Sequence, residues 1–328
     1  MKILLTLDYE LFLGERTGSV DCCLVVPMGY LSDAVKPYGA GFSIFVDATY
    51  LYRLNELRKD FKRLDSEYQK VVLHLLQLKE EGHDLQLHVH PHWHYSTYDG
   101  EKWVLDHEHY KLCDLSFEEA DQVFSLSKKH LDSIIGYSTT AFRAGGFSTQ
   151  PTSTLTALFQ KNGIRVDSSV CWGQYYNSPQ QAYDYRKAPR LDYYRFEEDI
   201  NLTEENGRFG EIPISMHTIS PLFYWKYVAT RLFKQPHMRQ WGDGLAVKAT
   251  NDSILERLTK FTQGMATIDG FKCGLLENAY QIAKKEGRRI FCVIGHPKLA
   301  TPYSIGKLAE FCERRKQDGD EFVTISQM

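Results

Sequence analysis

Four histidines stand at alternating positions in one short stretch, His88-Val89-His90-Pro91-His92-Trp93-His94, directly after a run typical of a β-strand. A packed hydrophobic core gives no reason to concentrate imidazoles in this way. Neutral histidine binds transition metals without first losing a proton from a charged form, so a high local density of histidine indicates metal ligands. The alternative is a polar, solvated loop in a chain that has 12 histidines in all. We favour the metal site.

Short apolar runs alternate with helical patterns along the chain. The runs that predict strands cover residues 2–7, 42–46, 84–89, 140–143, 164–169, 211–215, 290–294 and 322–325. The patterns that predict helices cover about 66–81, 116–136, 151–162, 252–264, 272–286 and 303–316. Such alternation predicts an α/β fold with a mainly parallel sheet. Seven or eight strands favour a distorted (β/α) barrel over an open doubly wound sheet, and we expect one barrel domain over residues 1–328.

Polar residues follow the ends of several predicted strands. Asp8 and Glu10 come after the first strand, and the histidine cluster ends the third. Arg143, Asp167 and His296 come at the ends of three later ones. In a parallel barrel the active groups lie just past the carboxyl ends of the strands. The sequence therefore predicts that these residues converge on one rim.

The composition excludes several classes of protein. The chain has 328 residues, is 43% hydrophobic and carries a net charge of -3, which provides no basic field for nucleic acid. Its seven cysteines are an odd number without CxxC spacing, so neither a disulfide framework nor a zinc ribbon is expected. The apolar run at the N-terminus is too short for a secretory signal, and we expect no transmembrane segment. These features predict a cytoplasmic protein.

Five short motifs occur in a fixed order along the chain. They are Thr6-Leu7-Asp8, His88-Val89-His90-Pro91-His92, Phe142-Arg143-Ala144-Gly145-Gly146, Asp167-Ser168-Ser169 with Trp172, and Ile294-Gly295-His296-Pro297. As an ordered set that spans most of the chain, they resemble the NodB-homology polysaccharide deacetylases. Within that superfamily the chain looks similar to the intracellular branch linked to surface-polysaccharide biosynthesis of the O-antigen type. The resemblance implies a distorted barrel of about seven βα units and metal-dependent removal of N- or O-acetyl groups from sugars.

The resemblance also implies a set of metal ligands. His88 and His92 stand in the HxxxH relation that the family uses, and His90, on the same strand face as His88, is the alternative to His92. The family's commonest first motif has two consecutive aspartates, the base and then a ligand, whereas Asp8 is separated here from Glu10 by a tyrosine. Glu10 could supply the missing carboxylate or could only orient another ligand. Zinc is the preferred metal, with cobalt, nickel or manganese as alternatives.

Four further positions take catalytic roles from the resemblance. Asp8 would be the general base, and Arg143 would hold that carboxylate ionised and oriented. His296 would be the general acid, with Asp167 hydrogen-bonded to its imidazole to keep it protonated. Hydrolysis of an acetamide needs these groups because it requires an activated water, a stabilised oxyanion and a proton for the departing nitrogen.

A long segment, about 171–250, separates the fifth predicted strand from the last βα units. Trp172, Tyr175 and Tyr176 stand there among polar residues, and flat aromatic rings stack on the apolar faces of sugars. We expect an insertion that forms a substrate wall or lid, the alternative being aromatic packing inside the insertion. Residues 219–241 are both aromatic and basic. They could lie on a membrane beside a lipid-linked sugar or bind a nucleotide-sugar phosphate, but an amphipathic helix packed on the barrel is favoured.

Taken together, the sequence predicts a metal-dependent carbohydrate deacetylase that hydrolyses a carbon–nitrogen amide bond. Its partner would be an acetylated sugar or polysaccharide precursor in a cell-surface pathway, and its location cytoplasmic, at most peripheral to the membrane. One alternative is a metal-dependent phosphoesterase on a seven-stranded barrel, but its HxH motif would follow the first strand, where this chain has Asp8 and Glu10. The other alternative is a carbohydrate-binding relative that has lost catalysis, because the second aspartate is missing.

Overall fold

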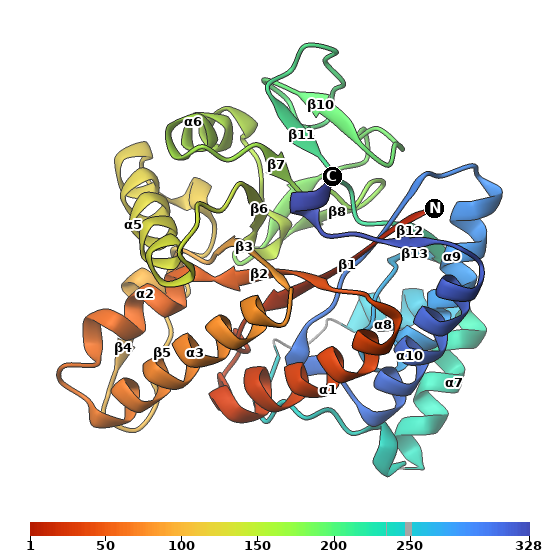
Figure 1. Ribbon diagram of the computed structural model, residues 1–328, viewed down its shortest axis with the longest axis horizontal. Helices are drawn as coiled ribbons and strands as arrows, with labels where there is room; N and C mark the ends of the chain where they lie inside the picture. Colours follow the sequence, from red (N-terminus) through yellow and green to blue (C-terminus); the bar gives the residue numbers. More distant parts are fainter. Residues whose placement is uncertain (234, 247–250) are drawn as a thin grey trace. The chain divides into compact units, whose positions relative to one another are not determined.

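The computed structural model describes residues 1–233, 235–246 and 251–328 (Figure 1). The chain forms two compact units, and each is discontinuous in sequence. The first unit comprises Met1–Gly41 and Ile214–Val323, and the second comprises Phe42–Pro213 and Thr324–Met328. The predicted insertion at 171–250 is therefore divided between the two units. None of the helices in the described ranges is both long and apolar enough to cross a membrane.

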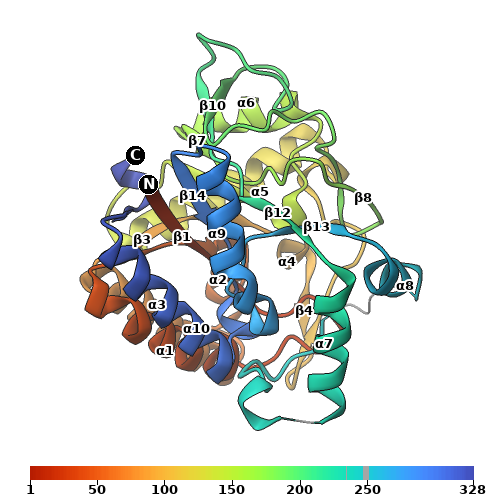
Figure 2. The same ribbon diagram turned by 90° about the vertical axis from the view of Figure 1, so that its right-hand side faces the viewer.

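The first unit is built around the N-terminal strand. Strand β1 (Lys2–Tyr9) runs parallel to β14 (Ile290–Val293) on one side and to β15 (Glu321–Phe322) on the other. A separate antiparallel pair joins β12 (Met216–Ile219) to β13 (Thr262–Met265). The helices of this unit are α1 (Val26–Val35), α7 (Pro221–Leu232), α8 (Asn251–Thr259), α9 (Leu276–Lys285) and α10 (Pro302–Gln317). Figures 1 and 2 both show α10 beside α1, and the two helices are in contact.

The second unit contains a longer parallel sheet. Its strands lie in the order β11-β7-β6-β3-β2, with β10 antiparallel at the outer edge of β11. The parallel strands are β2 (Phe42–Asp47), β3 (Asp84–Val89), β6 (Ala141–Ala144), β7 (Val166–Asp167) and β11 (Phe209–Glu211). The connecting helices are α2 (Ala48–Leu57), α3 (Lys62–Glu80), α5 (Phe117–Ile135) and α6 (Thr152–Asn162). Smaller elements are α4 (His92–Tyr95), β10 (Tyr194–Phe196) and the hairpins β4–β5 (Thr97–Tyr98, Trp103–Val104) and β8–β9 (Tyr175–Asn177, Ala182–Asp184).

Local sequence explains most of these boundaries. All residues of β2 and β3 are buried, which is why these strands read as nearly continuous apolar runs rather than alternating ones. Helix α5 begins at a capping box in which Ser116 and Glu119 exchange hydrogen bonds. It ends at Gly136, whose φ of 77° is a left-handed conformation that favours glycine.

The predicted parallel α/β fold is confirmed, whereas some boundaries are wrong. The helix predicted at 252–264 ends at Thr259, and residues 262–265 form β13 instead. The strand predicted at 211–215 is β11, which ends at Glu211. Helices α1 and α2 were not predicted. Closure into a barrel and the number of about seven strands stay predictions.

A buried charge network anchors the start of β1. The Arg315 side chain of α10 is 3% exposed and pairs with Glu277 at 3.2 Å and with Asp320 at 3.6 Å. Its guanidinium lies 3.8 Å from the centre of the Tyr280 ring. Asp320 also pairs with the amino group of Met1 at 2.8 Å. The same carboxylate therefore joins α10 to the strand that carries Asp8.

Replacing Arg315 tests this network. We expect Arg315→Met to lower the free energy of unfolding by about 2–3 kcal/mol, because it removes one of the two cationic partners of the buried Asp320 carboxylate. Urea unfolding followed by circular dichroism measures the change. Arg314→Met is the matched control, since its side chain is 56% exposed and lies 4.0 Å from Glu277. The control should change the same free energy by less than about 0.5 kcal/mol. Equal effects of the two substitutions would contradict a stabilising role of the buried network.

Candidate active site

The second unit places polar side chains at the carboxyl ends of its parallel strands. They are Asp47 on β2, His88 on β3, Arg143 on β6, Asp167 on β7 and Glu211 on β11. Each is at most 1% exposed. Burial of this many ionisable groups is costly unless they are hydrogen-bonded or paired, so their partners define what the cluster can do.

Two histidines of this cluster present ring nitrogens suited to a metal. Nδ1 of His88 lies 2.7 Å from the backbone oxygen of Arg143. Because a carbonyl oxygen can only accept, Nδ1 is the donor, and the lone pair of His88 is on Nε2. Nδ1 of His90 lies 3.2 Å from Oδ2 of Asp47, which gives the same tautomer. Each of the two histidines offers a ring nitrogen within 4.8 Å of that of the other.

Asp47 holds His90 in place. Its Oδ2 also accepts a hydrogen bond of 2.8 Å from Nε1 of Trp93, and its Oδ1 accepts from the backbone nitrogen of Tyr50 at the start of α2. Backing of a histidine by a carboxylate is the usual arrangement behind a metal-binding imidazole. Gly145 approaches the same ring, since a Cβ there would lie 2.5 Å from Cδ2 of His90. Glycine at this position therefore leaves room for the imidazole.

His92 and His94 lie on α4 instead of the strand. His92 is fully buried and stacks on the ring of Tyr110, with 4.6 Å between centroids and 7° between planes. His94 stacks edge-on against Tyr95. The described contacts favour His90, the alternative to His92, as the neighbour of His88. The proposed ligand role of His92 stays a prediction.

Arg143 and Asp167 are held on adjacent strands. Nε of Arg143 donates to the backbone oxygen of Ser168 at 2.7 Å, and its guanidinium lies 4.2 Å from the centre of the Phe45 ring. Asp167 accepts from both the backbone nitrogen and the hydroxyl of Ser169. Burial raises the pKa of Asp167 in spite of hydrogen bonds from Glu211 and Ser169 and the charge of Arg143.

The first unit carries a second cluster at the end of β1. Nε2 of His296 lies 3.7 Å from Oδ2 of Asp8 and 3.7 Å from Oε1 of Glu10. Glu10 pairs with the buried amino group of Lys298 at 2.8 Å. The backbone nitrogen of Asp8 donates to the oxygen of Gly295, which aligns β1 with the residue before His296. The predicted base and the predicted acid thus belong to one cluster.

Asp269 orients His296. Its Oδ2 lies 2.9 Å from Nδ1 of His296, and its Oδ1 accepts from the backbone nitrogen of the same residue. Burial opposes the charged imidazole, but the charge and hydrogen bond of Asp269 and the charges of Asp8 and Glu10 outweigh it and raise the pKa of His296. Asp167 was the predicted partner of this imidazole. The structure places Asp269 at Nδ1 instead.

The predicted substrate aromatics lie in the second unit. Tyr175 and Tyr176, on β8, are 52% and 46% exposed. Trp172 is buried, and the guanidinium of Arg190 lies 4.9 Å from its ring centre. The two tyrosines are therefore accessible for stacking against a ligand, whereas Trp172 is largely covered and its contact with a substrate stays a prediction.

Three acidic residues of these clusters were missed from the sequence. Asp47 directly follows the strand predicted at 42–46 and is the last residue of β2, so its place at the end of a buried strand was a usable signal. Glu211 pairs in register with Asp167 on the neighbouring strand, and this pairing is not visible in the sequence. Asp269 follows β13, a strand that was itself predicted as helix.

Comparisons with known proteins show the fold alone. No protein-family model matches the sequence, and no curated protein matches it. A solved structure from Mycobacterium smegmatis, provisionally assigned as a polysaccharide deacetylase, is 13% identical with a TM-score of 0.55 over 98% of this chain and 86% of that one. A structure of Puue allantoinase is 12% identical with a TM-score of 0.52 over 99% of this chain and 87% of that one.

The role of Asp269 can be tested by titrating His296. A raised pKa means that protonated His296 stabilises the folded protein below pH 6.5, the ordinary pKa, and that this contribution is lost as the pH rises through the folded-state pKa. We expect Asp269→Asn to lower the pKa of His296 in an NMR titration and to remove this pH-dependent stabilisation. Asp243→Asn, whose carboxylate accepts from Ser19 instead, is the control and should leave the titration unchanged. If the pKa of His296 is unaltered in Asp269→Asn, Asp269 is not the residue that raises it.

Proposed function

We propose that this protein is a metal-dependent hydrolase that removes an N-acetyl or O-acetyl group from a sugar in cell-surface polysaccharide biosynthesis. The observation that carries the proposal is the pair of buried histidines, His88 and His90, whose Nδ1 atoms face oxygen acceptors. Their Nε2 lone pairs are the chemistry a divalent metal needs. The ordered motifs that resemble the NodB-homology deacetylases give this metal site its proposed reaction.

We assign the ligands as His88 and His90, with Glu10 as the carboxylate and His92 as the alternative imidazole. This donor set of two imidazoles and one carboxylate suits zinc, and also cobalt, nickel or manganese. A bound ion of this kind would lower the pKa of a water molecule toward about 7 and polarise the acetyl carbonyl. The pair between Glu10 and Lys298 supports an ionised carboxylate, as a ligand must be.

In this proposal, other residues of the two clusters accept and donate the protons of the reaction. Asp8 would accept a proton from the attacking water, and Arg143 would hold that carboxylate in position. His296 would donate a proton from Nε2 to the departing nitrogen or oxygen, because Asp269 fixes the proton on Nδ1 and the raised pKa keeps the ring charged. Tyr175 and Tyr176 would stack on the apolar face of the sugar.

Metal content tests the ligand assignment. We expect one divalent ion per chain in the purified protein after incubation with zinc, measured by inductively coupled plasma mass spectrometry. His88→Ala and His90→Ala should each lose it, since a site with one imidazole fewer binds much more weakly. His94→Ala is the matched control from the same stretch and should retain the ion. If His92→Ala loses the ion and His90→Ala retains it, His92 is the ligand and His90 is not. A wild-type protein that binds no ion would refute the metal site.

Turnover separates the proposed enzyme from the two alternatives. We expect the metal-loaded protein to release acetate from N-acetylated or O-acetylated sugars, measured by an enzyme-coupled acetate assay. Asp8→Asn should lower kcat by about 100-fold or more, because it removes the general base. Asp33→Asn on the exposed face of α1 is the control and should leave kcat unchanged. Sugar binding without acetate release would favour the non-catalytic relative, and release of phosphate from sugar phosphates would favour the phosphoesterase.

A further inference from the structure

The first unit contains a cavity of about 640 Å³ that the proposed reaction does not use. It is lined by α7, α8 and the 3-10 helix Gly270–Leu275, together with Leu299 and Thr301. One wall is aromatic, since the rings of Phe223 and Tyr227 both stack on Phe271 with centroids 5.0 and 5.6 Å apart. A cavity of this size accommodates a small molecule or the head of a larger one.

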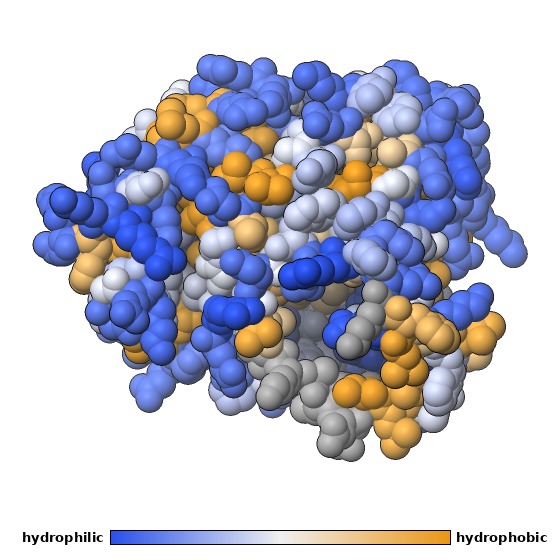
Figure 3. Space-filling model, turned by 90° about the horizontal axis from the view of Figure 1, so that it is seen from below, coloured by the Kyte–Doolittle hydropathy of each residue, from blue (hydrophilic) through white to orange (hydrophobic). Residues whose placement is uncertain are grey.

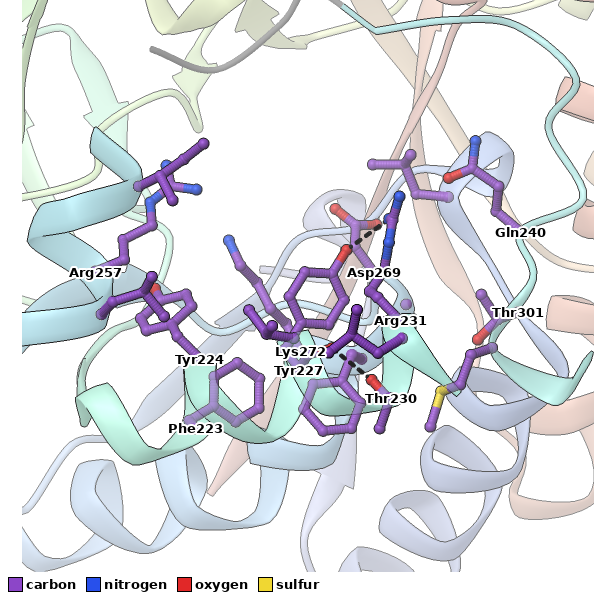
Figure 4. Close-up of a pocket in the computed structure, with 18 residues that line it drawn as sticks. Phe223, Tyr224, Tyr227, Thr230, Arg231, Gln240, Arg257, Asp269, Lys272 and Thr301 are labelled. Atoms are coloured by element: carbon purple, nitrogen blue, oxygen red, sulfur yellow. Dashed lines mark hydrogen bonds between the residues drawn. The ribbon is translucent and has the colours of Figure 1, made fainter. Parts of the chain in front are cut away.

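Three cationic side chains reach this cavity from three different elements. Figure 4 shows Arg231 of α7, Arg257 of α8 and Lys272 of the 3-10 helix extending into the same space, with the rings of Tyr224 and Tyr227 beside them. Arg231 donates to the hydroxyl of Tyr227 at 3.0 Å. Among the residues whose side chains are described, 251–253 not included, no carboxylate lies within 4.0 Å of any of the three cations, and the nearby negative charge that acts on Lys272 is that of Asp269.

The cavity therefore has an excess of positive charge. Asp269 is the acidic residue of its lining, and that carboxylate already bonds His296. Burial and the charge of Arg257 lower the pKa of Lys272, so an anion in the cavity would be favourable to both cations. Guanidinium and ammonium groups that converge in this way suit a phosphate or pyrophosphate.

The helices that form the cavity also expose apolar side chains. Leu232 and Phe233 at the end of α7 are 75% and 77% exposed, and Trp225 of the same helix is 55% exposed. Leu255 of α8 is 63% exposed. Figure 3 shows a group of apolar side chains, in orange, on the face that carries α7. Nε1 of Trp225 donates to the backbone oxygen of Leu258, so the two helices present these side chains together.

We infer that this cavity binds the phosphate or pyrophosphate head group of a lipid, whose hydrocarbon chain contacts the exposed apolar side chains of α7 and α8. A soluble phosphate ligand would give no partner to Trp225, Leu232 or Phe233, whereas a lipid chain or membrane surface covers them. Because Asp269 lines the cavity and holds Nδ1 of His296, a sugar attached to the bound phosphate would extend from the cavity past Asp269 toward Nε2 of the proposed general acid. This last step rests on the proposed function and makes the substrate a lipid-linked sugar.

Sedimentation with lipid vesicles tests the inference. We expect the protein to bind vesicles of phosphatidylcholine that contain phosphatidic acid and to bind vesicles of phosphatidylcholine alone weakly. Lys272→Gln should weaken binding about tenfold, because it removes one charge-assisted contact to phosphate. Lys226→Gln is the matched control, an exposed cation of α7 that does not line the cavity. Phe233→Ser should also weaken vesicle binding. Leu202→Ser is its control, because Leu202 is an apolar side chain that is 57% exposed elsewhere on the chain, and it should leave vesicle binding unchanged.

The other outcomes overturn the inference. If Lys272→Gln and Lys226→Gln weaken vesicle binding equally, the binding depends on general surface charge and not on the cavity. Tight calorimetric binding of uridine diphosphate without vesicle binding would identify a soluble phosphate ligand. Concentration-dependent dimerisation without vesicle binding would show that the exposed apolar side chains of α7 and α8 contact a second copy of this chain instead of a lipid. His88→Ala should bind vesicles normally, so failure of the metal site and failure of the lipid site are distinguishable.

Discussion

Asp47 is the carboxylate on which the candidate site of the second unit depends. It is 1% exposed, and an isolated charge at such a depth would cost several kcal/mol. Its donors are therefore fixed: the backbone nitrogen of Tyr50, the indole of Trp93 and Nδ1 of His90. One residue thus starts α2, positions α4 and sets the tautomer of the imidazole. The metal-binding potential of His90 follows from this requirement to satisfy a buried carboxylate.

In the first unit Asp269 likewise faces Nδ1 of an imidazole, that of His296, but the surroundings of this ring favour its charged form. His296 faces Asp8 and Glu10 as well as Asp269, and together these carboxylates outweigh burial and favour the charged ring. Nδ1 of His90 faces Asp47, which leaves Nε2 as the atom that the proposed metal site would use. The same carboxylate–imidazole interaction therefore orients a proposed metal ligand in one cluster and a proposed proton donor in the other.

The sequence predicted features that depend on local patterns. The buried runs of β2 and β3 and the histidine stretch were visible because burial on both faces produces consecutive apolar residues and because imidazoles are rare in such density. Residues 262–265 carry no apolar alternation and form a strand through their pairing with β12, a long-range contact. Asp269 follows that strand, so the partner of His296 could not be predicted before the pairing was known.

The proposed lipid site and the proposed general acid have Asp269 in common. Burial opposes the ionisation of this carboxyl, but the charge and hydrogen bonds of His296 and the charge of Lys272 outweigh it and hold its pKa below the usual range. The same carboxylate therefore faces both His296 and a cation of the cavity, so the proposed proton donor and the proposed lipid site share one negative charge.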